Sequence, residues 1–360
     1  MAVDGSVADV ARLVIRAPNW LGDVVMALPA MATVRAGLPA ASITVAAVPA
    51  LAPLFEEATI ARPDAVIAVP SPRAEMAALR EGRFDAALLL PNSFRSAWSA
   101  RRAGIRERWG VGANLRSLLL TRRVRRPRGR VHQARYYQAL VEALGFGGDV
   151  DDRVGEDPPG SAAGWKPGAE PAIRVRPGTA ARARRLLEAA GVAEDATLVG
   201  FAPGAAYGHA KRWPPRRVAE VVARLARERS VTAVLVGTAT DRDAGREIES
   251  SLPADVTLVN LIGRTDLRAL AGAVARCAAF VSNDSGAMHL AAALGVPVAA
   301  IFGPTDERVT SPLGEHDLLK HEVFCRPCML RDCPIDHRCM KGVSPDTVFG
   351  AVARRLEARA

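Results

Sequence analysis

Short runs of β-branched residues and leucine alternate along this chain with longer segments in which apolar positions recur with helical period. This alternation is typical of β-α-β units, in which helices join parallel strands. The predicted strands form two series. The first comprises residues 13–15, 43–47, 65–69 and 86–90, and the second residues 173–175, 198–202, 232–236, 257–260, 278–282 and 298–302.

Residues 145–171 separate the two series, and we place the hinge between two domains there. This stretch is rich in Gly, Pro and Asp and lacks an apolar period. The chain is therefore predicted to be an α/β protein with two Rossmann-like, doubly wound domains. Their expected bounds are 1–165 and 166–344, and a C-terminal helix over 345–360 is expected to pack back toward the N-terminal domain.

Charge and composition narrow the classes of partner. The 360 residues include 48 Lys and Arg against 38 Asp and Glu, a net charge of +10, which suits a polyanion, an anionic membrane surface or an anionic substrate. Only four of the cations are lysines, so a GC-rich genome that writes Arg for Lys explains the excess equally well. No signal peptide is recognisable, and the longest apolar run, residues 290–302, is too short to cross a bilayer.

Neither series of strands is followed by Gly-x-Gly-x-x-Gly, which disfavours a dehydrogenase. Ligands of doubly wound domains bind at the carboxyl ends of the strands, so we looked for chemistry there. The first strand leads into Asn-Trp-Leu-Gly-Asp at residues 19–23, directly before a predicted helix. Asp23 is a candidate general base. Alternatively, it is an acid favoured by the dipole of the helix N-terminus.

A second strand end carries the loop over residues 203–214, Pro-Gly-Ala-Ala-Tyr-Gly-His-Ala-Lys-Arg-Trp-Pro. Small residues such as Gly204 let the backbone approach a diphosphate, and Lys211 and Arg212 bring positive charge to it. One such ion pair is worth on the order of 4 kcal/mol before desolvation is subtracted. The alternative is a solvated basic loop.

A third strand end leads into Asn-Asp-Ser-Gly-Ala-Met-His-Leu at residues 283–290, which opens an apolar helix. The first N–H groups of that helix, at Ser285, Gly286 and Ala287, form a ready anion site. Asp284 could simply cap the helix. A cap would not explain His289 in an otherwise apolar segment.

These three motifs resemble the ADP-heptose:lipopolysaccharide heptosyltransferases of type II, in the same order and over nearly the whole chain. The resemblance implies a GT-B fold, in which two Rossmann-like domains face one another across a cleft. The type I members have two threonines before the lysine, whereas this chain has Ala206 and Tyr207, and this difference favours type II.

The resemblance also implies roles for individual residues. Asp23 would be the catalytic base, Lys211 would contact the donor diphosphate, and Asp241 would contact the ribose. Adenine would meet the backbone near Gly263 and Thr265. The full set of expected donor contacts is Gly204, Lys211, Arg212, Asp241, Gly263, Thr265, Asp284, Ser285, Gly286, Ala287 and His289; the expected acceptor contacts are Asn19, Gly22, Arg95 and Arg101.

Four of the five cysteines lie close together, at Cys325, Cys328, Cys333 and Cys339. Their spacing suits a structural zinc or an iron–sulfur cluster, although it is more compact than that of paired zinc knuckles. Unligated thiols and redox chemistry are the alternatives. No cofactor is required for the expected chemistry, because cations and helix N-termini can hold a diphosphate.

Two arginine-rich stretches, residues 95–102 and 122–130, are either a solvated face or a surface for lipopolysaccharide phosphates and an anionic membrane. The expected function is transfer of L-glycero-D-manno-heptose from ADP-heptose to a heptose of the lipopolysaccharide inner core. The enzyme would act in the cytoplasm, peripherally on the inner face of the inner membrane. Alternative hypotheses are a heptosyltransferase of type I, a transferase for another nucleotide sugar, or a basic metal-binding nucleic-acid protein. The sequence disfavours nucleic-acid binding, since no aromatic residues that could stack on bases lie within the arginine run over 122–130.

Overall fold

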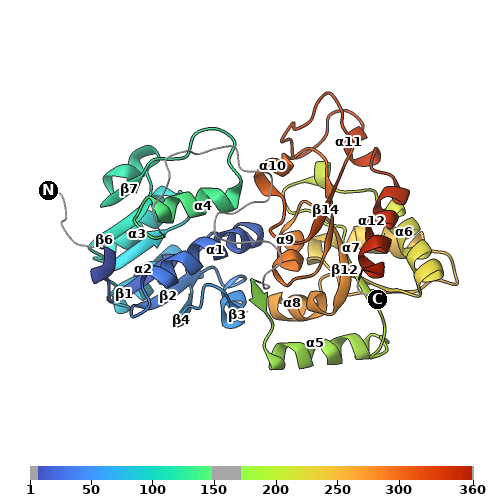
Figure 1. The fold of residues 1–360 in the computed structure, drawn as a ribbon, viewed down its shortest axis with the longest axis horizontal. Coiled ribbons are helices and arrows are strands. Elements are labelled where there is room, and N and C mark those ends of the chain that lie inside the picture. Colours follow the sequence, from blue (N-terminus) through green and yellow to red (C-terminus); the bar gives the residue numbers. More distant parts are fainter. Residues whose placement is uncertain (1–6, 148–171, 359–360) are drawn as a thin grey trace. The chain divides into compact units, whose positions relative to one another are not determined.

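The structure is a computed structural model that describes residues 7–147 and 172–358. Contacts divide the chain into two compact units, Met1–Lys166 and Pro167–Ala360 (Figure 1). Most of the expected hinge, and with it the expected boundary at 165/166, lies outside the described residues. In the described ranges no helix has the length and apolar character needed to span a membrane.

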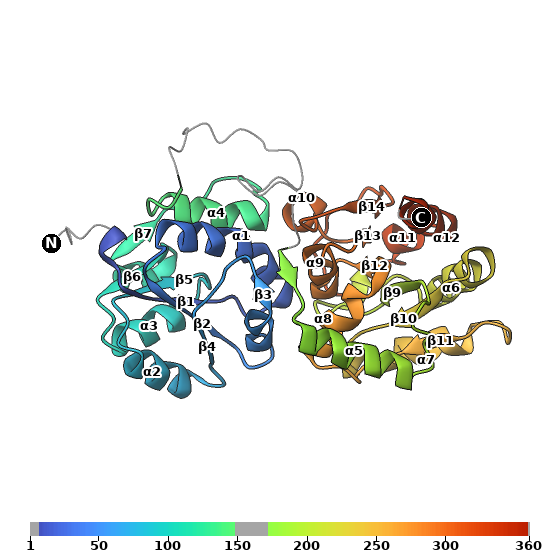
Figure 2. The ribbon, with the colours of Figure 1, turned by 60° about the horizontal axis from the view of Figure 1, so that its bottom comes forward.

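The first unit is built on a six-stranded sheet with the order β4-β2-β1-β5-β6-β7, and every strand pairing in it is parallel. Helices α1 and α4 cover one face and α2 and α3 cover the other (Figure 2). The strands are β1 (Arg12–Arg16), β2 (Ser42–Ala47), β4 (Ala65–Ala68), β5 (Ala86–Leu89), β6 (Glu107–Val111) and β7 (Arg122–Val124). The other elements are α1 (Leu21–Gly37), α2 (Pro72–Glu81), α3 (Phe94–Arg102), α4 (Gln133–Glu142), η1 (Val7–Asp9), η2 (Ala52–Glu56), η3 (Asn114–Leu118) and β3 (Ala58–Thr59).

The second unit repeats this plan with the parallel order β11-β10-β9-β12-β13-β14. One apolar cluster lies between the sheet and α5, α8 and α9, and another between the sheet and α6, α7 and α12. The strands are β9 (Leu198–Ala202), β10 (Thr232–Leu235), β11 (Leu258–Asn260), β12 (Cys277–Asn283), β13 (Val298–Phe302) and β14 (His316–Lys320). The helices are α5 (Pro177–Ala189), α6 (Pro215–Arg229), α7 (Arg242–Ser250), α8 (Leu267–Ala275), α9 (Gly286–Ala293), α10 (Glu307–Thr310), α11 (Arg338–Lys341), α12 (Pro345–Glu357), η4 (His209–Lys211) and η5 (Ala239–Asp241).

The prediction of two doubly wound parallel sheets is confirmed, because the first strand of each six-stranded sheet, β1 or β9, is one of its two central strands. Three sheet strands were not predicted: β6, β7 and β14. Each carries Arg, Glu, His or Asp, and β7 and β14 form sheet edges, where charged side chains are tolerated. The short strand predicted at 173–175 forms as β8 (Ile173–Arg174) but belongs to neither six-stranded sheet.

The last helix, α12, packs in the core of the second unit. Val348 and Val352 are fully buried there with Val221 of α6 and Val281 of β12. The apolar face of this helix covers the second sheet and α6, and the expectation that the helix returns toward the N-terminal domain stays a prediction.

A buried asparagine holds the two ends of the loop over residues 203–214, which we call the lysine loop. Asn283, the last residue of β12, is 2% exposed. Its Nδ2 donates to the carbonyl of Pro203 at 2.7 Å, and its Oδ1 accepts from the backbone N–H of Trp213 at 3.1 Å. Because one side chain bonds both ends, the path of the loop is tied to the end of β12.

We expect Asn283→Ala to lower the free energy of unfolding of the second unit by about 1–3 kcal/mol, because two buried backbone groups lose their partner. Chemical denaturation of the whole chain measures the loss. Asn260→Ala is the control, since the Asn260 side chain accepts one hydrogen bond, from Ile262 N at 3.0 Å, at the half-buried end of β11. Equal losses in the two variants would contradict the role assigned to Asn283.

Candidate active site

Asp23 lies in the first turn of α1, after the carboxyl end of β1. It is half-buried, and burial raises the pKa of its carboxyl group. Among the described residues it accepts no hydrogen bond and forms no ion pair. The dipole of a helix N-terminus favours an acid in the first turn without a hydrogen bond, so this interpretation stays open beside that of a general base. A desolvated carboxylate with a raised pKa is a stronger base, as the second interpretation requires.

The loop before Asp23 is held by a buried ion pair that sequence reasoning missed. Arg16, the last residue of β1, pairs with Glu75 of α2 at 3.1 Å, and both side chains are 6% exposed. The same guanidinium donates to Asn19 Oδ1 at 2.9 Å. A charged residue at the end of an apolar strand was the available signal. Asn19, an expected acceptor contact, is thus fixed in place beside α1.

In the second unit, Lys211 and Asp284 form a largely buried ion pair. Lys211 Nζ lies 2.7 Å from Asp284 Oδ2, and the two side chains are 12% and 7% exposed. Lys211 is the last residue of η4, which follows β9, and Asp284 directly follows β12. Strands β9 and β12 are neighbours in the sheet. Two motifs that lie 73 residues apart in the sequence thus meet in one site.

Helix α9 begins directly after this pair. Its N-cap is Ser285, whose side chain makes no capping hydrogen bond; the Ser285 hydroxyl lies 3.0 Å from that of Ser282 instead. Asp284 is therefore an ion-pair partner and not the helix cap. With no side chain capping it, the start of α9 presents backbone N–H groups at Gly286 and Ala287 to an anion. His289 is buried one turn further along, 3% exposed.

Asp241 occupies the adjoining strand end, in η5 after β10. Its Oδ2 accepts from the backbone N–H of Thr238 at 3.0 Å, which is one of the two bonds of a capping box, and also from the Thr238 hydroxyl at 2.8 Å. Its Oδ1 lies 3.4 Å from a guanidinium nitrogen of Arg212. A Cβ at Gly204 would lie 2.3 Å from that carboxylate, so only glycine permits the approach. Lys211 and Arg212 thus each have a carboxylate partner, and the lysine loop is not a freely solvated basic loop.

The remaining expected contacts also follow the carboxyl ends of strands. The backbone N–H of Gly263, after β11, donates to Gly237 O at 3.0 Å, and Thr265 is half-buried nearby in sequence. Arg95 and Arg101 are both exposed on α3, which follows β5, the neighbour of β1. Arg95 is in the first turn and Arg101 lies about 9 Å further along the helix axis.

The four clustered cysteines lie within residues 325–339, which we call the cysteine segment. Cys339 is buried and the other three are half-buried. Across the described residues, no group of three or more His, Cys, Asp or Glu is arranged to hold a metal ion. Burial opposes ionisation of Cys333, but backbone N–H groups at Ile335, His337 and Asp336 lower the pKa of its thiol. Burial raises the pKa of Cys339, and the three other cysteines act on it in the same direction.

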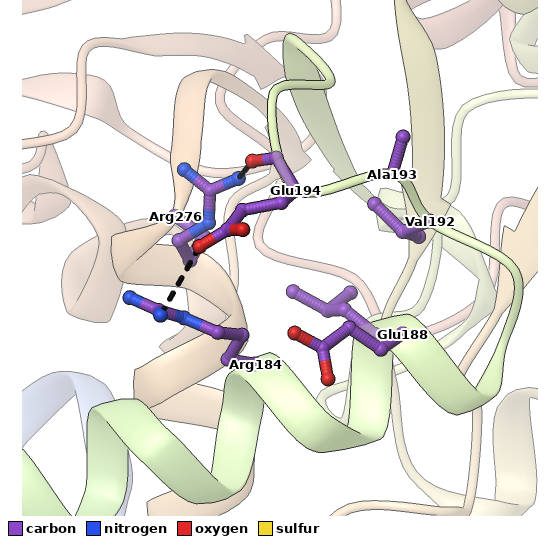
Figure 3. Close-up of a pocket in the computed structure, with 7 residues that line it drawn as sticks. Arg184, Glu188, Val192, Ala193, Glu194 and Arg276 are labelled. Atoms are coloured by element: carbon purple, nitrogen blue, oxygen red, sulfur yellow. Dashed lines mark hydrogen bonds and ion pairs between the residues drawn. The ribbon is translucent and has the colours of Figure 1, made fainter.

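A separate pocket of the second unit does not belong to this site. It is lined by residues at the end of α5, in the loop before β9, and by Arg276, which precedes β12. Figure 3 shows Arg184 and Arg276 both reaching Glu194, the first in an ion pair at 3.2 Å and the second on its carbonyl at 2.9 Å. The pocket lies at the amino ends of β9 and β12, opposite to the edge that carries Lys211 and Asp284.

Comparisons with known proteins identify the family. The model of glycosyltransferase family 9 (heptosyltransferase) matches residues 73–338. Lipopolysaccharide heptosyltransferase 2 of Salmonella typhimurium is 33% identical over 319 residues, which is 84% of this chain and 85% of that protein. Lipooligosaccharide heptosyltransferase 2 of Haemophilus influenzae is 31% identical over 84% of this chain and 86% of its own.

A solved structure is also similar over the whole length. The structure of E. coli ADP-heptose lps heptosyltransferase II matches with a TM-score of 0.79 and 29% identity, and covers 97% of this chain and 100% of that one. The two parallel sheets, the motifs at their carboxyl edges and these matches lead to one conclusion: the chain belongs to glycosyltransferase family 9, the heptosyltransferase family.

Proposed function

We propose that this protein is an inverting glycosyltransferase that transfers L-glycero-D-manno-heptose from ADP-heptose to a heptose of the lipopolysaccharide inner core. The observation that carries the proposal is the Lys211–Asp284 ion pair beside the uncapped start of α9. This arrangement suits a bound diphosphate, and the relatives that match over most of the chain are named heptosyltransferase 2. The names favour type II over type I, which remains the second candidate.

In the proposed reaction the second unit holds the donor and the first unit activates the acceptor. Asp23 accepts the proton of the acceptor hydroxyl, whose oxygen forms a bond to the anomeric carbon of the heptose. The bond from that carbon to the phosphate oxygen breaks, and ADP leaves. Lys211, Arg212 and the N–H groups of α9 stabilise the charge that develops on the diphosphate. Asp284 holds Lys211 near that position and is proposed to contact the donor sugar.

The proposed donor site predicts selectivity for the nucleotide. ADP and ADP-heptose should raise the melting temperature of the protein, whereas UDP and NAD should raise it far less, because Asp241 and the backbone near Gly263 are assigned to the adenosine. A ligand present at a hundred times its Kd stabilises the folded state by about 2.7 kcal/mol. Thermal shift assays with the four compounds give the comparison. An equal shift with UDP removes the ADP assignment.

Replacing Asp23 tests the base directly. Asp23→Asn should reduce transfer about 100-fold or more while donor binding survives. It should also raise the melting temperature at neutral pH. Because burial raises the pKa of Asp23, the folded protein binds its proton more tightly than the unfolded chain, so ionisation destabilises the fold as pH rises, and Asn removes that loss.

The two interpretations of Asp23 differ in the sign of that stability change. A helix N-terminal acid would contribute about 0.3–1 kcal/mol, and its removal would lower the melting temperature. The gain in melting temperature expected for Asp23→Asn should shrink in acid, where the carboxyl group of Asp23 is protonated in the folded and in the unfolded state. Lys211→Ala is the matched comparison and should weaken ADP binding as well as turnover. Near-native transfer by Asp23→Asn would reject Asp23 as the base.

The cysteine segment is assigned a structural metal, zinc or an iron–sulfur cluster, that takes no part in the chemistry. The backbone N–H groups that favour the thiolate of Cys333 support this assignment, since metals bind thiolates. Metal analysis of protein prepared without chelator should find about one zinc or an iron centre per chain. Joint replacement of Cys328 and Cys333 by Ser should lower the melting temperature clearly, whereas the turnover per folded molecule should change little. Absence of both metals would leave the cluster as free thiols.

A location at the cytoplasmic face of the inner membrane is supported by an apolar patch on the first unit. Phe94 and Trp98 of α3 are 49% and 46% exposed with their rings stacked, and Leu115 and Leu118 of the neighbouring η3 are 72% and 75% exposed. Arg95, Arg101 and Arg102 are exposed on the same helix. Aromatic and apolar side chains beside arginines are suited to an anionic lipid surface.

We therefore expect the protein to bind vesicles that contain an anionic phospholipid more tightly than neutral vesicles, and less tightly as salt is raised. Joint replacement of Trp98 and Leu118 by Ser should weaken vesicle binding several-fold, measured by co-sedimentation. Ile335→Ser is the control, because Ile335 is an equally exposed apolar residue of the other unit. Unchanged binding by the double variant would contradict this surface.

A further inference from the structure

The cysteine segment packs directly on the lysine loop, and the proposed reaction assigns it no part there. The hydroxyl of Tyr207 donates to the carbonyl of Met329 at 3.1 Å, and the backbone N–H of Ala210 donates to the carbonyl of Arg331 at 2.9 Å. Two residues of the loop on either side of Gly208 are thus bonded to the segment.

Gly208 shows how close this contact is. A Cβ atom built on Gly208 would lie 2.3 Å from the carbonyl oxygen of Arg331 and 2.8 Å from its carbonyl carbon. The neighbouring atoms are backbone, which cannot move aside as the end of a side chain can. A residue with a side chain would therefore separate the loop from the segment, immediately before the turn that carries Lys211.

The ring of Tyr207 links the segment to Lys211. Lys211 Nζ lies 4.9 Å from the centre of that ring, and the guanidinium carbon of Arg331 lies 5.1 Å from it. Both distances are within the range of cation–π attraction. The ammonium group is thus located by two neighbours, the ring of Tyr207 and the carboxylate of Asp284.

The other side of the cysteine segment is anchored firmly to the second sheet. Arg326, 4% exposed in its side chain, pairs with Glu307 at 2.8 Å and donates to the carbonyl of Gly303 at 2.6 Å. The backbone N–H of Met329 donates to the carbonyl of Pro304 at 2.9 Å. Cys339, at the end of the segment, belongs to the apolar core. Because the cysteine segment is fixed to the sheet, it can hold the lysine loop that packs against it in a fixed position.

From these contacts we propose that the cysteine segment positions Lys211 for the donor diphosphate, with Tyr207 and Arg331 as positioning residues. This inference rests on the proposed function, which assigns Lys211 to the diphosphate. The segment restricts the lysine side chain before the donor arrives, so less freedom is lost on binding. Its effect should therefore appear in donor affinity more than in the stability of the fold.

The test measures the Kd for ADP by calorimetry on the full chain. Tyr207→Leu removes both the ring and the hydroxyl, and Arg331→Ala removes the second cation; each should weaken ADP binding about two- to fivefold. Tyr207→Phe keeps the ring but loses the bond to Met329, so it should weaken ADP binding less than Tyr207→Leu does. Arg331→Lys keeps the cation and should bind ADP nearly as tightly as the native protein. Arg338→Ala is the matched control, because Arg338 also stacks on an aromatic ring, Phe324, but forms its ion pair within the segment, with Asp336.

A double-mutant cycle separates positioning from direct contact. In a Lys211→Ala background, Tyr207→Leu and Arg331→Ala should have almost no further effect on the Kd, because the group that they position is gone. A full effect in that background would mean that Arg331 or Tyr207 acts on ADP without Lys211, and would overturn the inference. Losses of affinity equal to that of Arg338→Ala, which reflect general loosening of the segment, would overturn it as well.

The outcome for Lys211 itself distinguishes this inference from the proposed function. If Lys211→Ala binds ADP as the native protein does, the diphosphate role assigned to Lys211 fails, and the inference fails with it. If Lys211→Ala weakens ADP binding while Tyr207→Leu does not, only the positioning role fails.

Discussion

The geometry of the candidate site in the second unit depends on two hydrogen bonds of the buried Asn283 side chain. This side chain bonds Pro203 and Trp213, the two ends of the lysine loop, and Asn283 is followed directly by Asp284 and the start of α9. One residue therefore sets the distance between the loop that carries Lys211 and the helix end that faces it. An amide suits this position because it offers a donor and an acceptor at once, whereas a carboxylate would offer only acceptors.

The cations of the site are held in place by carboxylates. Lys211 pairs with Asp284, and Arg212 lies beside Asp241. Buried ion pairs contribute little to stability, since desolvation offsets the attraction. In the proposed donor site their value is orientation, because a cation that already has a fixed position would lose little freedom when a diphosphate binds. The backbone contacts from the cysteine segment act in the same sense on the loop itself.

The sequence was sufficient for most strands of the two sheets, because buried parallel strands are apolar on both faces and stand out between helical segments. It was insufficient for β6, β7 and β14, which carry charged residues or histidine and therefore lack that pattern. Asp284 and Lys211 were each identified from a local motif, but their pairing was not, since it depends on β9 and β12 being neighbours. Arg16 and Glu75 were missed for the same reason: the charge at the end of β1 does not identify its partner, and only the packing of α2 near β1 joins the two residues.

Three carboxylates of the two units differ in a way that fits the proposed division of labour between the units. Asp284 and Asp241 are both engaged by cations. Asp23 is desolvated, and the pKa of its carboxyl group is raised. A group that must remove a proton from a hydroxyl benefits from that higher basicity, and the folded protein accepts a desolvated charge to provide it. The cation-paired Asp284 and Asp241 thus suit the proposed role of the second unit in holding a charged donor, and the desolvated Asp23 suits the proposed role of the first unit in activating an acceptor.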